Sequence, residues 1–139
     1  MENKLTKIIS DYFADKPEVI AVYLFGSYAK EQQRHMSDID LGILLRRNCL
    51  DQAANKRTEY QSELSRILRK DIHPVILNTV EDQLLKQIFN KGVCLLNKNP
   101  GEHARYKMFM YAKIADFNFY SQKMQSGFIQ KIIEGSIHG

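Results

Sequence analysis

The apolar and polar positions along the chain predict helices and strands that alternate through most of its length. Apolar residues at helical spacing indicate a first helix over residues 4–14, which the polar segment 15–17, ending in proline, terminates. The continuous apolar run 19–25 is typical of a buried strand, and a second strand is expected over residues 38–45. Residues 31–37, between these strands, are polar and indicate a loop.

A long helix and two further strands follow, and these strands complete the predicted sheet. Apolar positions between residues 50 and 69 fall on one helical face, which predicts an amphipathic helix. The strand expected over residues 72–77 contains Pro74, which favours an edge position because proline cannot donate a ladder hydrogen bond. A short last strand is expected over residues 93–96. The order α-β-β-α-β-α-β-α indicates the α/β (α+β) class, with helices packed on a small mixed sheet in which the first two strands can pair directly.

A short helix is expected between the last two strands, over residues 80–90. Thr79 stands where an N-cap residue is needed and Asp82 takes the third helical position, which resembles a capping box with Asp in place of Glu or Gln. Gly92 marks the end of this helix, because glycine is frequent just after a helical C-terminus.

The last predicted helix, over about residues 102–126, is long and carries two apolar stripes. One stripe is sufficient for a surface helix. Two interpretations remain open: the helix is simply well buried, or one stripe packs on the sheet while the other meets a partner chain in a hetero-oligomer. The first stripe holds Tyr106, Met110, Ile114, Phe117 and Met124, and the second holds Phe109, Ala112, Phe119 and Tyr120.

Composition narrows the class of protein. The 139 residues are 44% hydrophobic and 26% charged, which indicates one globular domain over residues 1–139, with its core at about 5–97. The apolar runs are too short to span a bilayer, so we expect no membrane association and a cytoplasmic location. The formal net charge of +4 is compatible with an anionic partner, but an ordinary solvated surface explains it better, so nucleic acid is not required.

Two polar elements, separated by ten residues, carry the candidate chemistry. Gly26-Ser27 ends the first strand, where glycine permits a tight turn and serine opens a segment whose free N–H groups suit a phosphate. Asp38 and Asp40 lie two apart in a predicted strand, so their carboxylates share one face and repel unless a cation lies between them. Oxygen ligands of this kind suit Mg²⁺ or Mn²⁺. Ser37, just ahead, can orient one carboxylate.

The two elements together resemble the signature of the polymerase-β nucleotidyltransferase superfamily, and more narrowly the minimal nucleotidyltransferases of prokaryotes. The resemblance rests on segments 24–29 and 37–41 and covers roughly residues 5–97. It implies transfer of a nucleoside monophosphate from a nucleoside triphosphate to a hydroxyl. It also implies that the two aspartates bind the metal, while Gly26 and Ser27 bind the triphosphate. Lys30 and Arg34 could neutralise phosphate charge, which is a positional inference only.

In the family that the chain resembles, a third carboxylate on the next strand usually completes the metal site. This carboxylate has no clear counterpart in the chain. Aligned back from Leu77-Asn78, His73 takes its position, and Asp71 lies two residues earlier on the same predicted face. Either Asp71 acts as the third catalytic carboxylate from the strand end, or His73 replaces it, or neither does. Neutral histidine binds metals but suits Mg²⁺ poorly.

Minimal members of the family often accompany a HEPN-type ribonuclease toxin, so the resemblance implies an antitoxin that transfers AMP from ATP to a hydroxyl of that toxin. The alternative is an inactive or weakly active member that neutralises such a toxin by binding alone.

Overall fold

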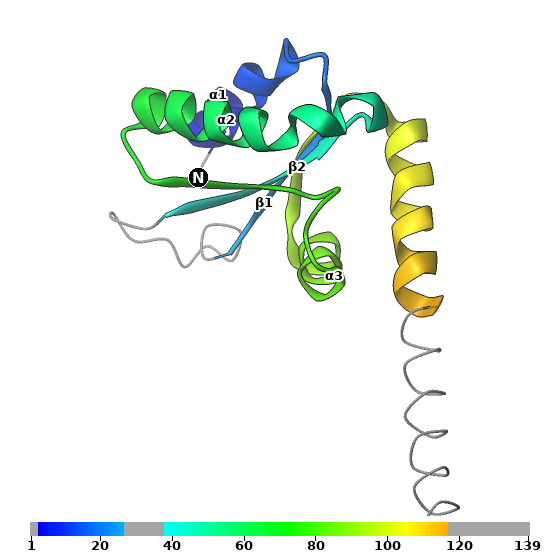
Figure 1. Ribbon diagram of the computed structural model, residues 1–139. Coiled ribbons are helices and arrows are strands. Elements are labelled where there is room, and N and C mark those ends of the chain that lie inside the picture. The colour runs from blue at the N-terminus through cyan, green and yellow to red at the C-terminus, as the bar shows by residue number, and fades with distance from the viewer. Residues whose placement is uncertain (1–2, 27–37, 117–139) are drawn as a thin grey trace, which may run out of the picture. The chain divides into compact units, whose positions relative to one another are not determined.

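The computed structural model describes residues 3–26 and 38–116 (Figure 1). The predicted loop at residues 31–37 and the last part of the predicted terminal helix lie outside these ranges. The chain divides into two compact units, Met1–His103 and Ala104–Gly139. The elements of the first unit are α1 (Asn3–Ala14), β1 (Val19–Phe25), β2 (Ile39–Leu45), the 3₁₀ helix η1 (Arg47–Gln52), α2 (Ala53–Leu68), β3 (Ile72–Ile76), α3 (Asp82–Lys91) and β4 (Val93–Asn97).

The four strands form one mixed sheet in the order β3-β2-β1-β4. β1 pairs antiparallel with both β2 and β4, whereas β2 and β3 run parallel. The direct pairing of the first two strands and the mixed sheet are therefore confirmed. β3 lies at an edge of the sheet, as the proline predicted. There the missing N–H of Pro74 does not interrupt hydrogen bonds between two central strands.

Helices cover both faces of this sheet: α1 and α2 lie on one face and α3 on the other (Figure 1). Alternate residues of β2 point to the two faces. Ile39, Leu41 and Ile43 are fully buried in the core beneath α1 and α2. Gly42, on the opposite face, packs against Leu77 and Ile88. Both faces of the central strands are covered, which explains why the β1 sequence is apolar at every position.

A buried polar cluster holds α2 against the start of β1. The Tyr60 hydroxyl donates a hydrogen bond of 2.5 Å to Glu18 Oε2, and Lys56 Nζ lies 3.6 Å from the same oxygen. The Tyr60 ring also packs edge-on against Phe13 of α1, with centroids 5.0 Å apart. Because Glu18 is only 7% exposed, its charge requires these partners.

The helix expected over residues 50–69 begins differently, because η1 forms its first turns and the α-helical part starts at Ala53. The predicted capping box at α3 is wrong. The N-cap residue is Glu81, without a side-chain capping bond, and Asp82 is the first helical residue. Thr79 instead donates its hydroxyl to the Ile76 carbonyl at 3.1 Å, in the turn that follows β3.

A further helix, over residues 100–116, begins in the first unit and continues into the second. It starts two residues earlier than predicted. Asn99 caps it: its Oδ1 accepts a 3.1 Å hydrogen bond from the Glu102 N–H, and its Nδ2 donates to Glu102 Oε2 at 3.1 Å. Within the ranges that the structure describes, no helix combines the length and hydropathy needed to cross a bilayer.

The two apolar stripes of this helix differ in exposure. Met110 and Ile114, from the first stripe, are buried. Phe109, from the second stripe, is 59% exposed, and the neighbouring Met108 is 72% exposed. The interpretation that the helix is buried all round is therefore wrong for its described part.

Candidate functional site

The turn after β1 and the start of β2 form one compact feature. Phe25 pairs with Asp40 across the two antiparallel strands, so Gly26 follows directly beside this carboxylate. Gly26 has a φ of +75°, in the left-handed region that glycine adopts without steric cost. A Cβ atom at this position would lie 2.3 Å from Asp40 Oδ2. The absent side chain of Gly26 is therefore what makes room for the Asp40 carboxylate.

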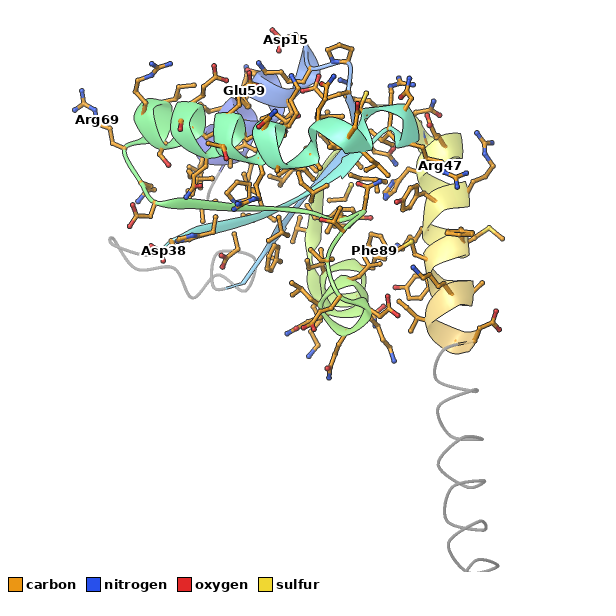
Figure 2. The ribbon with its side chains drawn as sticks, in the orientation of Figure 1. Asp15, Asp38, Arg47, Glu59, Arg69 and Phe89 are labelled. Carbon is orange, nitrogen blue, oxygen red and sulfur yellow. The ribbon has the colours of Figure 1, made fainter. Side chains whose placement is uncertain are left out.

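Asp38 and His73 form the second contact of the site. Asp38 precedes β2, at the opposite end of that strand from Arg47 (Figure 2). Its Oδ2 lies 3.1 Å from His73 Nε2, and both side chains are about half exposed, at 51% and 49%. The parallel register of β2 and β3 pairs His73 with Asp40. Asp38, Asp40 and His73 are thus brought to one end of the sheet.

The environment of Asp40 disfavours its charged form. Partial burial raises the pKa of the Asp40 carboxyl above its ordinary value, and the nearby Asp38 carboxylate raises that pKa further. His73 acts in the opposite direction but does not outweigh these effects. A bound cation beside the two carboxylates would offset both the burial and the repulsion.

Asp71, the other predicted third carboxylate, lies one residue before the first β2–β3 pair. Its backbone carbonyl accepts a 2.9 Å hydrogen bond from the Ile39 N–H, which fixes the start of the parallel register. The Asp71 side chain is exposed, and its charge is not among those that shift the pKa of Asp40. The register therefore brings His73, rather than Asp71, beside Asp40. A catalytic role for Asp71 stays a prediction.

Four predicted phosphate-binding or orienting residues lie outside the described ranges, namely Ser27, Lys30, Arg34 and Ser37. Gly26 is the one residue of that predicted set for which the structure gives a conformation. Nucleotide binding by Ser27, Lys30 and Ser37 stays a prediction.

The candidate metal-ligating atoms of the site match the preference of a hard divalent cation only in part. Two carboxylates on one strand match Mg²⁺ or Mn²⁺, and the space against Gly26 lets one of them lie close to the backbone. No three His, Cys, Asp or Glu side chains among residues 3–26 and 38–116 are grouped so as to enclose an ion. A cation at Asp38 and Asp40 would therefore need further ligands that the described side chains do not supply.

Asn78 holds the turn after β3 against β2, and it was not identified as a functional residue from the sequence. Its Oδ1 accepts the Leu45 N–H at 2.9 Å, and its Nδ2 donates to the Leu45 carbonyl at 3.0 Å. Both bonds tie the turn after β3 to the far end of β2. Together with the Ile39–Asp71 backbone bond, they fix the register that brings His73 beside Asp40.

Comparisons with known proteins agree with this arrangement. The family model for polymerase beta nucleotidyltransferases matches residues 7–101, which include the whole candidate site. Protein adenylyltransferase MntA of Shewanella oneidensis is 34% identical to the chain over 91 residues. These residues make up 66% of this chain but only 61% of that relative, so the chain spans less than two thirds of its length.

Solved structures show a similar fold. A toxin–antitoxin crystal structure with AMP-PNP matches with a TM-score of 0.60 at 24% identity, over 95% of this chain and 98% of the other. The structure of a tri-AMPylated Shewanella oneidensis HEPN toxin in complex with an MNT antitoxin matches with a TM-score of 0.61 at 21% identity, over 96% and 99% of the two chains. Because the family model spans both halves of the candidate site, the chain belongs to the polymerase beta nucleotidyltransferase family.

Proposed function

We propose that the chain transfers AMP from ATP to a hydroxyl group of a HEPN-type toxin and thereby acts as its antitoxin. The observation that carries the proposal is the packing of Asp40 against the Cβ-free turn at Gly26, with Asp38 on the same end of β2. This arrangement keeps a phosphate-binding turn and a carboxylate pair in contact. We assign the reaction to the cytoplasm, where ATP is available.

The reaction joins the acceptor oxygen to the α-phosphorus and breaks the bond between the α-phosphorus and the oxygen that bridges to the β-phosphate. Pyrophosphate leaves, and the proton of the acceptor hydroxyl passes to the solvent. Mg²⁺, when bound, supplies the positive charge that stabilises the phosphates in the transition state. Asp38 and Asp40 would hold this ion at the end of β2. Gly26 keeps the turn free of side-chain atoms, so that backbone N–H groups can approach a phosphate.

The relatives support both the donor and the partner. The curated relative is named a protein adenylyltransferase, and one structural neighbour contains a HEPN toxin that carries AMP groups. Another neighbour was crystallised with AMP-PNP, an ATP analogue. These descriptions belong to those proteins, and they make ATP and a HEPN-type toxin the first donor and acceptor to test here.

The test is transfer of label from α-³²P-ATP to a purified HEPN-type partner, with the wild-type chain and with Asp38→Asn and Asp40→Asn. We expect transfer by the wild type and a loss of at least about 100-fold in either variant, because each removes one cation ligand. Asp15→Asn is the matched control, since Asp15 is an exposed carboxylate far from Asp38 (Figure 2). Absence of transfer by the folded wild-type chain would exclude the proposed activity.

A second candidate function is neutralisation by contact alone. Two observations favour it: His73, and not a carboxylate, pairs with Asp40 across β2 and β3, and Phe109 is 59% exposed on the helix over residues 100–116. Under this alternative, the Asp38→Asn/Asp40→Asn double variant neutralises the toxin as well as the wild type does. Under the first proposal, the double variant still binds the toxin but no longer neutralises it.

A further inference from the structure

The C-terminal end of α2 presents positive charge together with an apolar side chain. Arg66, Ile67 and Arg69 are all exposed, Ile67 by 50%. Lys70 follows and is partly buried, and residues 66–70 contain no acidic side chain. Arg66, Ile67 and Arg69 together are called the basic turn below.

Stabilisation of the helix explains this composition only in part. A cation near a helix C-terminus interacts favourably with the helix dipole, which accounts for Arg66 in the last turn of α2. It does not account for Ile67, half of which is exposed. Nor does it account for Arg69, which has a φ of +53°, in the left-handed region that glycine usually occupies at a helix end. An arginine at this position carries a conformational cost that glycine would avoid.

The two guanidinium groups of the basic turn are available to a partner. The ion pairs formed among residues 3–26 and 38–116 use other cations, and neither Arg66 nor Arg69 takes part in one. Glu63, the acid nearest to Arg66 along α2, already accepts the Tyr12 hydroxyl and lies 3.8 Å from Lys16 Nζ. The charge of the basic turn is therefore not neutralised by the described part of the chain.

The basic turn borders the candidate site without belonging to it. The Asp71 carbonyl accepts a 2.9 Å hydrogen bond from the N–H of Ile39, the residue directly after Asp38. Arg69 is two residues before Asp71, which spans at most about 7 Å of chain. Figure 2 shows Arg69 and Asp38 at the same end of this unit, with the Arg69 side chain extending away from Asp38. An acceptor that reaches the site can therefore contact the basic turn, whereas the nucleotide does not need it.

We infer that the basic turn docks an acidic segment of the acceptor protein and thereby orients the acceptor hydroxyl toward the site. This role rests on the proposed function, because it concerns the acceptor of that transfer, and it adds the chemistry by which the acceptor is recognised. Guanidinium groups bind carboxylates through paired hydrogen bonds. A segment with acidic residues on either side of an apolar one would complement Arg66, Ile67 and Arg69.

A protein segment fits this surface better than a nucleic acid does. Nucleic-acid binding depends on many cations along the phosphate backbone. Here two exposed guanidinium groups adjoin Asp38 and Asp71, whose charge would repel phosphates. The exposed Ile67 adds nothing to a phosphate contact but contributes to a protein interface. One helical turn is small for a stable interface, so we expect it to steer and orient the acceptor rather than supply most of the affinity.

The first experiment measures association with a purified HEPN-type toxin by stopped-flow fluorescence, without ATP, at low and high salt. The Arg66→Glu/Arg69→Glu variant should associate about 10-fold more slowly than the wild type at low salt. This difference should nearly disappear at high salt, because salt screens the charges. Arg47→Glu is the matched control, since Arg47 is exposed at the opposite end of β2, and it should associate at the wild-type rate (Figure 2).

Arg69→Gly separates docking from folding. Glycine accepts the left-handed conformation of this position, so the melting temperature should equal or exceed that of the wild type. Loss of one guanidinium should still slow association about 3-fold at low salt. Wild-type association by Arg69→Gly would contradict a docking role for this side chain.

The second experiment locates the contact, with the photo-cross-linker p-benzoylphenylalanine at position 67 and, as a control, at position 47. We expect position 67 alone to cross-link to the toxin, at a segment with acidic residues. Docking by the basic turn is overturned if position 67 gives no cross-link, if the cross-linked segment has no acidic residue, or if the wild-type chain does not bind the toxin. It is also overturned if charge reversal weakens binding of a single-stranded RNA oligonucleotide but not association with the toxin. Neither experiment uses ATP, so a failure of AMP transfer would exclude the activity and leave this result standing.

Discussion

Gly26 and Asp40 lie so close together that any side chain at position 26 would overlap the carboxylate. The hypothetical Cβ of residue 26 falls 2.3 Å from Asp40 Oδ2 and 3.2 Å from its Cγ. Gly26 also adopts a φ of +75°, which side-chain-bearing residues rarely accept. The turn at Gly26 and the Asp40 carboxylate are therefore one structural unit, and a change in one displaces the other.

Gly26→Ala is expected to reduce AMP transfer about 100-fold, because displacement of a reacting group by about 1 Å costs that much. It should also destabilise the fold by about 1–2 kcal/mol, since alanine in the left-handed region is strained. Initial transfer rates and urea unfolding midpoints measure the two effects. Transfer at the wild-type rate by folded Gly26→Ala protein would show that the turn does not position Asp40.

The control for loss of stability is Gly42→Ala, on β2, the strand that carries Asp40. A Cβ at residue 42 would lie 2.8 Å from Leu77 Cδ2, so this variant is overpacked in the core beneath α3. We expect destabilisation of about 1–3 kcal/mol. Its folded fraction should still transfer AMP, in contrast to that of Gly26→Ala.

Asp40→Asn is expected to stabilise the metal-free protein at neutral pH while it abolishes transfer. The folded state raises the pKa of Asp40 through burial and the Asp38 charge, so ionisation of Asp40 costs stability once the pH exceeds its ordinary value of 3.8. The free energy of unfolding of the wild type therefore falls as the pH rises through the raised pKa of Asp40. That of Asp40→Asn does not, because asparagine does not ionise. Because Asp40 is only partly buried, the gain should be on the order of 0.5–1 kcal/mol.

Urea unfolding of both proteins at pH 4 and pH 7, with chelator present, measures this effect. The difference in free energy of unfolding between Asp40→Asn and wild type should be larger at pH 7 than at pH 4. An equal difference at both values would mean that ionisation of Asp40 does not couple to folding. A saturating divalent cation should reverse the order, because it stabilises the wild type alone.

The sequence was sufficient to predict the strands and to place Asp38 and Asp40 at the start of the second strand, but not to say which residue of β3 lies beside Asp40. The apolar run 19–25 predicts β1 with its observed bounds, because a strand covered on both faces needs apolar residues throughout. Whether Asp71 or His73 lies beside Asp40 depends on the β2–β3 register. That register is set by long-range contacts, such as the Asn78 bonds to Leu45, which no local pattern encodes.

The ends of helices were also not fully predictable from the sequence. Thr79 has the residue type of an N-cap, but its hydroxyl bonds the Ile76 carbonyl in a turn instead, and the helix starts later. Ser, Thr, Asn and Asp side chains satisfy turns and helix starts alike, so their identity alone does not choose between them. The Asn99–Glu102 pair was a readable capping signal, and it marks the true start of the helix over residues 100–116.

Tyr60→Phe is expected to destabilise the fold by about 1.5–3 kcal/mol at neutral pH, because it removes a hydrogen bond to a charged, buried group. Burial alone would raise the pKa of Glu18, but the Tyr60 hydrogen bond, its own backbone N–H and the nearby lysines lower that pKa overall. A lowered pKa gives stability above the ordinary value of 4.5, and this stability is lost as the pH falls through the folded-state pKa. The cost of Tyr60→Phe should therefore shrink in acid.

Thermal unfolding at pH 7 and pH 3 tests this expectation, with Tyr12→Phe as the matched control. Tyr12 also donates its hydroxyl to a carboxylate, Glu63, but that pair is only partly buried. Loss of the Tyr12 hydroxyl should lower the free energy of unfolding clearly less than loss of the Tyr60 hydroxyl does. Equal costs for the two variants, or a Tyr60→Phe cost that does not change with pH, would contradict a charged Glu18 in the core.

Phe109→Ser is expected to weaken binding of the HEPN-type partner about 10-fold or more while the isolated chain stays folded. Phe109 is 59% exposed, so its replacement removes little buried area from the free chain. In a complex the same ring would be an aromatic anchor, the kind of residue that contributes most to protein interfaces. Isothermal titration calorimetry gives the affinity, and circular dichroism confirms the fold. Met110→Ala, at a buried position of the same helix, should instead lower the melting temperature. If Phe109→Ser binds the partner as tightly as the wild type does, the exposed stripe is not the interface.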